Sequence, residues 1–405
     1  MSANYIIIGN GVAGTEAAKS IRKRDTQAEI MIFTQDHYPF YSRPRLPELL
    51  AKEVTVEEIF VYKREWYNKN KIQLNLNCTV KSIDPENKRI TLADKSNFTY
   101  NKLLLDTGSS GILPPIDGIN TAEGVFTLRT VEDVLTIIKR AACAKTVTLI
   151  GGGLLGLEAG NGLRKLGLSV TVVEFFDRLL PRQLDSEGAV ILQKQMEELG
   201  LKFFLGAQSK SIKDAGTTKI LELKDGKVIE SNFILVSAGI KPNISLAQAA
   251  GISANKGIIV NDCMETSIPN IYAAGDVAEH NGRIYGIWPA AQRQGVIAGI
   301  NMAGGNESYA GTVPSTSLKV AGIHLTSMGD MLVEDKTVEQ VKVKNPDKNI
   351  YKKLFIQDGR IIGAIFLGDT KNAYEMGQLL EKKVDVSRFK DKILETDFDI
   401  KSLLK

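Results

Sequence analysis

The chain has 405 residues, of which 43% are hydrophobic and 24% are charged, as in ordinary globular proteins. This length allows about two to four domains, and the net charge of +4 gives no indication of a nucleic-acid partner. No apolar run of about 18 residues and no leader-like start is present, which predicts a cytoplasmic protein without membrane segments.

The first predicted unit is a strand over residues 5–8, a glycine turn, a helix over 12–24 and a second strand over 30–33. The turn has the spacing G-x-G-x-x-G and is formed by Gly9, Gly11 and Gly14. Glycines let the backbone turn tightly and approach a pyrophosphate, and the start of the helix offers N–H groups to it. This unit therefore predicts a dinucleotide site.

The position after the second strand departs from the usual pattern. An acid is expected there, because it would accept hydrogen bonds from the adenosine ribose, but the sequence has Thr34, then Gln35 and Asp36. The ribose would be held by the Thr34 hydroxyl, by backbone groups or by Asp36, and these three possibilities stay open.

Residues 37–50 are aromatic, basic and interrupted by proline, which predicts a shaped loop and a helix beginning near Pro47. Arg43 and Arg45 are the candidate functional side chains of this loop, and the alternative is that both are simply solvated. The apolar spacing over 51–71 predicts an amphipathic helix.

Residues 72–99 alternate in polarity and contain turn signals, which predicts a small antiparallel sheet. A buried strand over 103–105 then ends in Asp106, Thr107 and Gly108. A small apolar residue is expected at the end of such a strand. Asp106 therefore either caps a turn through backbone N–H groups or lies near a bound cofactor.

A second copy of the first unit follows a proline-rich linker and a helix over 131–142. Its strand, 147–150, leads into another G-x-G-x-x-G turn, formed by Gly151, Gly153 and Gly156. Strand, turn and helix again stand in register, so a second dinucleotide site is predicted.

An acid closes the next strand of this second unit, at Glu174. A carboxylate in this position accepts both ribose hydroxyls of NAD and repels the additional phosphate of NADP. Glu174 therefore favours NADH. Arg178 lies four residues later and would bind a phosphate in the alternative interpretation.

The strand over 233–236 ends in a small-residue turn at Gly239, which repeats the end of the corresponding strand in the first unit. A later strand, 271–274, brings Gly275 and Asp276 to its carboxyl end, the edge at which open α/β sheets bind ligands. An acid there can accept a hydrogen bond from a sugar-alcohol hydroxyl.

These patterns predict an α/β protein with two Rossmann-like dinucleotide-binding domains, one inserted in the other, and a small C-terminal α+β domain. The C-terminal part ends in a basic run, Lys382, Lys383, Arg388, Lys390 and Lys392, which is either a docking surface or a solvated face. The predicted boundaries are 1–112 and 244–312 for the first nucleotide-binding domain, 113–243 for the second and 313–405 for the C-terminal domain.

Together the motifs resemble those of the FAD-dependent pyridine nucleotide-disulfide oxidoreductases, which have a glutathione-reductase-like fold, and within them most of all the NADH:rubredoxin oxidoreductases. The resemblance covers nearly the whole chain. Its residues are Gly9-Gly11-Gly14, Tyr41-x-Arg43-Pro44, Gly151-Gly153-Gly156-x-Glu158, Gly239-x-x-Pro242-Asn243, Gly275-Asp276 and Leu318-Lys319-Val320.

The resemblance implies FAD in the first unit and NADH in the second, with flavin N5 as the reactive atom and no metal. It places Asp276 at the ribityl chain, Glu158 near the flavin and nicotinamide rings, and Lys319 as a second supporting residue. The predicted FAD-binding residues are Gly9, Asn10, Gly11, Val12, Ala13, Gly14, Thr34, Arg43, Val80, Thr107, Gly108, Arg129, Asp276, Ile287 and Lys319. The predicted NAD-binding residues are Gly151, Gly153, Leu154, Leu155, Gly156, Glu158, Glu174 and Gly239.

Relatives that reduce disulfides carry cysteine beside the flavin, whereas the corresponding loop here, 41–47, has none. Cys78, Cys143 and Cys263 are widely separated and lack C-x-x-C spacing, which argues against a disulfide framework or a metal site. The implied acceptor is therefore a small acidic one-electron carrier protein, most of all rubredoxin. The alternatives are a flavin subunit or reductase for nitrite reductase, a flavodiiron protein or ferredoxin, an NADH oxidase and, remotely, a non-catalytic flavin-binding module.

Overall fold

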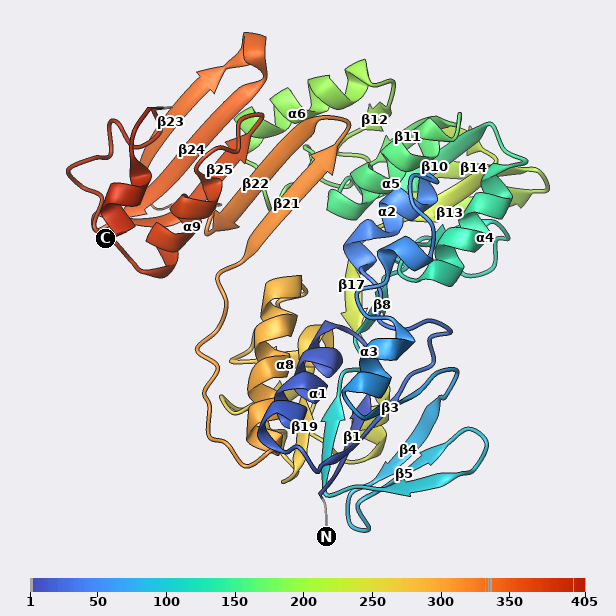
Figure 1. Cartoon of the computed structure of the whole chain (residues 1–405). Coiled ribbons are helices and arrows are strands. Elements are labelled where there is room, and N and C mark those ends of the chain that lie inside the picture. Colours follow the sequence, from blue (N-terminus) through green and yellow to red (C-terminus); the bar gives the residue numbers. More distant parts are fainter. Residues whose placement is uncertain (1–2, 332, 334, 336, 396, 405) are drawn as a thin grey trace. The chain divides into compact units, whose positions relative to one another are not determined.

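The computed structural model of the chain (Figure 1) describes residues 3–331, 333, 335, 337–395 and 397–404. The chain divides into two compact units. The first contains the chain up to Arg45 together with Thr55–Ser110 and Ile240–Thr312. The second contains Leu46–Val54, Gly111–Gly239 and the chain from Val313. Each unit is thus assembled from separate stretches of sequence.

Five parallel strands form the central sheet of the first unit, in the order β19-β7-β1-β2-β3. The apolar run of β1 is paired on both sides, with Ile6 opposite Met31 of β2 and Leu103 of β7, so the strand is buried. The helix α1 (Val12–Arg24) connects β1 to β2, as in the doubly wound fold. The strands are β1 (Asn4–Ile8), β2 (Glu29–Phe33), β3 (Ile72–Asn75), β7 (Lys102–Leu105) and β19 (Ile271–Ala273).

Smaller elements complete this unit. A three-stranded antiparallel sheet has the order β4-β5-β6, and β18 pairs in parallel with β20. The antiparallel sheet predicted from residue 72 therefore begins only at Val80, because the strand before it joins the parallel sheet. The elements are η1 (Arg43–Arg45), η2 (Glu57–Ile59), α3 (Arg64–Lys69), β4 (Val80–Asp84), β5 (Arg89–Leu92), β6 (Asn97–Thr99), β8 (Ser109–Gly111), β17 (Ile240–Pro242), α7 (Ser245–Ala249), β18 (Ile258–Val260), η3 (Gly275–Val277), β20 (Ala278–His280) and α8 (Trp288–Met302).

The amphipathic helix predicted over 51–71 is wrong for most of its length, since only α3 within it is an α-helix of more than one turn. The backbone of this segment pairs instead with the loop before η1. The N–H of Val61 donates to the carbonyl of Phe40 (2.9 Å), and the N–H of Ser42 donates to the carbonyl of Ile59 (2.8 Å). These long-range bonds satisfy backbone groups that a helix would have paired locally.

The helices α1 and α8 lie side by side (Figure 1) and approach at two glycines of α8. A Cβ atom on Gly295 would lie 2.7 Å from Cα of Ala13, and one on Gly299 would lie 2.7 Å from Cα of Ala17. Real Cβ atoms do not come so close to backbone. The two helices therefore pack backbone against backbone, which fixes the start of α1 next to the sheet.

We expect Gly295→Ala to lower the free energy of unfolding of the first unit by about 1–3 kcal/mol, because the new methyl group must push two helices apart. Both tryptophans, Trp66 and Trp288, lie in this unit, so urea unfolding followed by tryptophan fluorescence reports on it. Gly377→Ala is the control. Gly377 lies in the second unit, and a methyl group there would meet, among the described atoms, only the Met328 sulfur at 3.5 Å, so the tryptophan-detected midpoint is expected to stay that of the parent. Equal midpoints for parent and Gly295→Ala would contradict the packing argument.

The second unit contains another parallel sheet, in the order β12-β11-β10-β16-β9. The helix α5 (Leu154–Lys165) connects β10 to β11, just as α1 connects β1 to β2. A separate antiparallel sheet has the order β13-β14-β15. The other elements are α2 (Leu46–Leu50), β9 (Val125–Thr127), α4 (Val131–Ala141), β10 (Thr146–Ile150), β11 (Ser169–Val173), α6 (Ser186–Glu198), β12 (Lys202–Phe204), β13 (Ser209–Ala215), β14 (Thr218–Leu223), β15 (Val228–Ser231) and β16 (Phe233–Val236).

The C-terminal part of the second unit is a five-stranded antiparallel sheet, β21-β22-β25-β24-β23, with α9 packed on it through a buried apolar cluster. Its elements are β21 (Ser315–Val320), β22 (Ile323–Gly329), β23 (Glu339–Asn345), η4 (Pro346–Lys348), β24 (Ile350–Gln357), β25 (Arg360–Leu367), α9 (Ala373–Glu381) and η5 (Ile400–Leu404). The predicted α/β class is confirmed, while the residue boundaries between the predicted domains stay predictions. None of the helices in the described part of the chain has the length and apolarity to cross a membrane.

Candidate functional site

The first glycine turn connects β1 to α1 and has a backbone that only glycine can adopt. Gly9 has φ +113°, and a Cβ atom on it would collide with the carbonyl oxygen of Asp106. A Cβ on Gly14 would lie 2.7 Å from the carbonyl oxygen of Gly9. The turn therefore brings the N-terminus of α1 up to the end of β1, where a phosphate group can reach its N–H groups.

Asn10, within this turn, has a buried side chain whose oxygen is hydrogen-bonded but whose Nδ2 group is not, among the described residues. The Tyr67 hydroxyl donates to Asn10 Oδ1 (2.9 Å), and burial raises the pKa of that hydroxyl to about 12. The Asn10 Nδ2 group finds no hydrogen-bond partner among the described residues, although the residue is only 5% exposed. A buried donor of this kind is costly unless a ligand accepts from it.

Asp106, at the end of β7, is bound to the same turn. Its Oδ2 atom accepts hydrogen bonds from the N–H groups of Gly11 (3.0 Å) and Gly14 (2.8 Å). Burial raises the pKa of this carboxyl to about 7, although both N–H groups and the nearby Arg43 act in the other direction. Asp106 does accept from backbone N–H groups, as one of the two interpretations of the sequence predicted, but these belong to α1 and not to its own turn.

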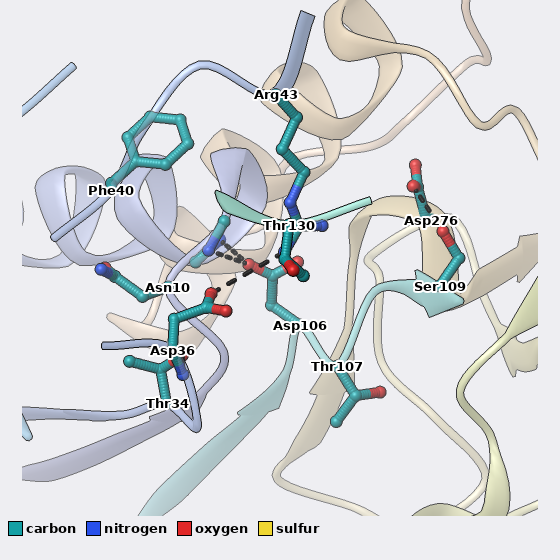
Figure 2. Close-up of polar contacts among 12 residues, drawn as sticks. Asn10, Thr34, Asp36, Phe40, Arg43, Asp106, Thr107, Ser109, Thr130 and Asp276 are labelled. Atoms are coloured by element: carbon teal, nitrogen blue, oxygen red, sulfur yellow. Dashed lines mark hydrogen bonds and ion pairs between the residues drawn. The ribbon is translucent and has the colours of Figure 1, made fainter. Parts of the chain in front are cut away.

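Figure 2 shows Asp106 with two charged side chains of the first unit, Arg43 and Asp36, near it. Arg43 lies on η1 and places one guanidinium nitrogen 3.8 Å from an Asp36 carboxylate oxygen. The Thr34 hydroxyl is buried and accepts a hydrogen bond from the N–H of Asp36 (3.2 Å). Thr34 thus holds the turn that carries Asp36, and the choice between them as the ribose partner stays open.

Asp276 lies on η3, directly after β19, in the same part of the first unit. Its Oδ2 atom accepts a hydrogen bond from the Ser109 hydroxyl (2.9 Å). Thr107 is tied to Asn243 by two bonds: its hydroxyl donates to the Asn243 carbonyl (2.9 Å), and the Asn243 amide donates to the Thr107 carbonyl (2.8 Å). Gly108, next to it, has φ +63°. These bonds fix the loop after β7 beside the Asp276 carboxylate.

The remaining predicted FAD residues fall into two groups. Val12 and Ala13 form the first turn of α1, Val80 begins β4, and Ile287 is the residue before α8, all in the first unit. Arg129 and Lys319 belong to the second unit. The contact of all six residues with FAD stays a prediction.

The second glycine turn has the same backbone form as the first. Gly151 has φ +112°, and a Cβ on Gly156 would collide with the Gly151 carbonyl oxygen. A Cβ on Gly153 would meet no described atom within 4 Å, so the approach to the start of α5 is open. The turn thus leaves room for a pyrophosphate beside Leu154 and Leu155, the first residues of the helix.

Glu174, after β11, is buried and braces this turn. Its Oε2 atom accepts from the N–H of Gly152 (2.5 Å), and its Oε1 atom accepts from the N–H of Phe176 (2.9 Å). The Arg178 guanidinium is directed to its own loop, with Asp177 at 3.1 Å and the Leu184 carbonyl at 3.3 Å. Glu174 is therefore fixed at the turn, while Arg178 is engaged elsewhere.

Glu158, on α5, is a half-buried acid that accepts a hydrogen bond from the backbone of another element of the second unit. Burial raises the pKa of its carboxyl to about 7, opposed by a hydrogen bond from the backbone N–H of Lys319 on β21 and reinforced by the charge of Glu48. The Lys319 side chain itself is exposed. Glu158 can therefore hold or release a proton near neutral pH.

Gly239, another predicted NAD residue, lies after β16 and has φ +108°.

Residues 3–295, most of the chain, match the pyridine nucleotide-disulphide oxidoreductase family. The chain belongs to this family. Residues 314–384 also match the rubredoxin NAD+ reductase C-terminal domain. The resemblance inferred from the motifs is therefore confirmed at the level of the family.

Two curated relatives and one solved structure are similar to this chain over nearly its whole length. The assimilatory nitrate reductase electron transfer subunit of Bacillus subtilis is 37% identical over 97% of this chain and 51% of its own length. The NADH-rubredoxin oxidoreductase of Clostridium acetobutylicum is 32% identical over 99% of this chain and 100% of its own. The solved structure of NADH:rubredoxin oxidoreductase from that organism has a TM-score of 0.79, with 29% identity over 98% of each chain.

The chain spans about half the length of two of the curated relatives that it matches, 51% of the nitrate reductase electron transfer subunit and 48% of a nitrite reductase, both of Bacillus subtilis. The first glycine turn fits FAD, because the Asn10 Nδ2 group, which has no partner among the described residues, and the N–H groups of the first turn of α1 can donate to pyrophosphate oxygens. Sequence reasoning missed Tyr67, which holds Asn10, and Ser109, which holds Asp276. In the sequence, only the position of Ser109 directly after Thr107-Gly108 could have indicated its role, and no pattern indicated a role for Tyr67.

Proposed function

We propose that the chain takes a hydride from NADH onto FAD and passes single electrons to a small acidic redox protein of the rubredoxin type. One observation carries this proposal: the chain matches an NADH-rubredoxin oxidoreductase over 99% of its own length and 100% of that protein. A match to the C-terminal domain of rubredoxin reductases over 314–384 adds support from the other end of the chain.

Bound FAD supplies the chemistry, since it accepts a hydride as a pair of electrons and releases electrons one at a time. The residues of the chain bind and orient the cofactors. The N-terminus of α5 and the turn at Gly153 would hold the NADH pyrophosphate, and Glu174 would accept the ribose hydroxyls. Asp276 would accept from a ribityl hydroxyl, held in place by Ser109. Glu158 would hold a proton, because burial keeps its pKa near 7.

Two features favour this type of electron acceptor, namely the absence of cysteine from the loop over 41–47 and the exposed basic side chains near the C-terminus. The loop over 41–47 contains no cysteine, so no protein sulfur takes electrons there. Exposed basic side chains near the C-terminus, Lys382, Lys383, Arg388 and Lys392, would each attract a carboxylate of an acidic carrier, and exposed acids such as Asp385 and Asp391 alternate with them. A one-electron carrier of negative charge therefore fits this enzyme better than a disulfide substrate.

Steady-state reduction of rubredoxin, ferredoxin and oxygen by the purified protein with NADH tests the proposal. We expect kcat/KM for rubredoxin to exceed that for oxygen by at least about a hundredfold, because only a specific partner is steered and docked. Anaerobic addition of NADH is expected to bleach the flavin. Bleaching without preference for rubredoxin would overturn the acceptor, and no bleaching would overturn the oxidoreductase function.

A second candidate is an electron-transfer subunit for a larger reductase. It is favoured by the relatives of about twice this length, which are a nitrate reductase subunit and a nitrite reductase. In that case flavin electrons would pass to a partner protein and rubredoxin would be reduced slowly. An NADH oxidase, also among the relatives, would instead be identified by fast oxygen consumption without any protein acceptor.

A further inference from the structure

Asp106 occupies part of the place that the first glycine turn offers to a phosphate. Its Oδ2 atom already accepts from the N–H groups of Gly11 (3.0 Å) and Gly14 (2.8 Å), and the residue is only 8% exposed. Two of the donors at the start of α1 are thus taken by a carboxyl group of the protein itself. In the usual fold these donors are available to the dinucleotide.

The donors that remain still point to an anionic ligand. Val12 and Ala13 are the first residues of α1, so their N–H groups have no acceptor within the helix. The Asn10 Nδ2 group lies in the same turn, buried and without a hydrogen-bond partner in the described part of the chain. A pyrophosphate accepting from these groups would lie directly beside the Asp106 carboxyl.

The charges around Asp106 cannot neutralise both a carboxylate and a pyrophosphate. Arg43, on η1, is the cation that acts on Asp106, and it also lies 3.8 Å from Asp36 (Figure 2). Asp276, on η3, adds a further negative charge near Asp106. Among the described groups that act on Asp106 or on Arg43, one guanidinium thus faces three carboxyl groups before any ligand is bound. An additional dianionic group in this buried place strongly favours loss of one of the negative charges.

A proton on Asp106 removes this conflict at little cost. Burial raises the pKa of Asp106 to about 7, against the opposing effects of the Gly14 and Gly11 N–H groups and of Arg43. The Oδ2 atom can keep its two bonds to the helix while Oδ1 carries the proton and donates it to a phosphate oxygen.

We propose that Asp106 holds FAD in its neutral, protonated form, so that binding of FAD takes up one proton from solvent. This inference rests on FAD occupying the first glycine turn, as the proposed function requires. No bond of FAD is formed or broken, and the proton is returned to solvent when FAD leaves.

The sign of the pH dependence follows from linkage. Bound FAD raises the pKa of Asp106 further above its value of about 7 in the protein alone. The affinity for FAD is therefore constant below about pH 7 and falls by up to about tenfold for each pH unit above it. An ionised Asp106 that took no part in binding would give an affinity independent of pH.

The experiment is dilution of the holoenzyme between about pH 6 and about pH 9, with released FAD measured by its fluorescence. For the parent we expect the Kd to rise by about tenfold to a hundredfold across this range. Asp106→Asn keeps a carbonyl oxygen for the helix and an N–H donor for the phosphate, and it cannot ionise. We expect its Kd to change little with pH, to equal that of the parent near pH 6 and to be lower than that of the parent near pH 9.

Asp36→Asn is the matched control, since it removes a neighbouring charge but leaves Asp106 free to titrate, and the slope with pH is expected to remain. Calorimetry of FAD binding in two buffers of different ionisation enthalpy should show uptake of about one proton by the parent at pH 8 and none by Asp106→Asn. A flat pH profile of the parent would overturn the proposal, and this holds even if Asp106→Asn does not fold. Failure to retain FAD at any pH would instead overturn the proposed function.

Discussion

Glu174→Gln is expected to lower kcat/KM for NADH by about tenfold to a hundredfold and to raise kcat/KM for NADPH. The carboxyl group is buried at the second glycine turn, and if it accepts from ribose hydroxyls as proposed, such charge-assisted bonds would contribute about 1.5–3 kcal/mol. The glutamine carbonyl can still accept from the N–H of Gly152, whereas its amide nitrogen cannot replace the second bond, from the N–H of Phe176. The substitution removes the negative charge that would repel the additional phosphate of NADP. Initial rates with both coenzymes at fixed acceptor measure the ratio.

Arg178→Ala provides the control for this experiment. The Arg178 guanidinium bonds to Asp177 and to carbonyl groups of its own loop, so its removal should leave the coenzyme ratio unchanged. If Arg178→Ala lost activity with NADPH while Glu174→Gln kept full activity with NADH, the site would prefer the phosphorylated coenzyme. The role assigned to Glu174 would then be wrong.

Arg388→Glu combined with Lys392→Glu is expected to lower kcat/KM for rubredoxin by about tenfold at low salt. Both side chains are exposed in the basic run near the C-terminus, and an acidic partner would meet repulsion in place of attraction. Salt screens charges beyond about 10 Å at 0.1 M, so the difference should shrink as ionic strength rises. Stopped-flow reduction of rubredoxin over a salt series gives this dependence directly.

Reduction of a neutral quinone by the same double variant should be unchanged, since no charge steers that acceptor. Lys224→Glu with Lys256→Glu makes the same change in net charge at exposed positions outside the basic run and should leave the rubredoxin rate near that of the parent. Equal losses in both double variants would mean that net charge acts at long range and that the basic run is not a docking surface.

The glycine turns and the strands around them could be predicted because their signals are local. A run such as Val147–Ile150 followed by three spaced glycines specifies strand, turn and helix within a short window. The identity of the fold then followed from two such units in order. The segment 51–71 could not be predicted in the same way, because its backbone pairs with Phe40 and Ser42, which no periodicity reveals.

The residues of the candidate site also divide into those that could be predicted from local sequence and those that could not. The glycines and the acids at strand ends were found from spacing alone, whereas the partners of Asp106 lie 95 and 92 residues away in sequence. From the sequence, Asp106 was notable only because an acid is unexpected at the end of a buried strand. Its bonds to Gly11 and Gly14, and the bond of Tyr67 to Asn10, depend on how β7 and α3 are packed against the first turn, which requires the tertiary structure.

The division of the first unit into separate stretches has a consequence for biosynthesis. The ribosome must deliver Ile240–Thr312 before β19 can close the edge of the first sheet and α8 can cover α1, while the sheet built around β10 is complete once β16 has emerged. The first sheet is therefore begun first but finished second, and a nascent polypeptide halted at Gly239 would have a complete sheet around β10 but an open edge where β19 pairs with β7.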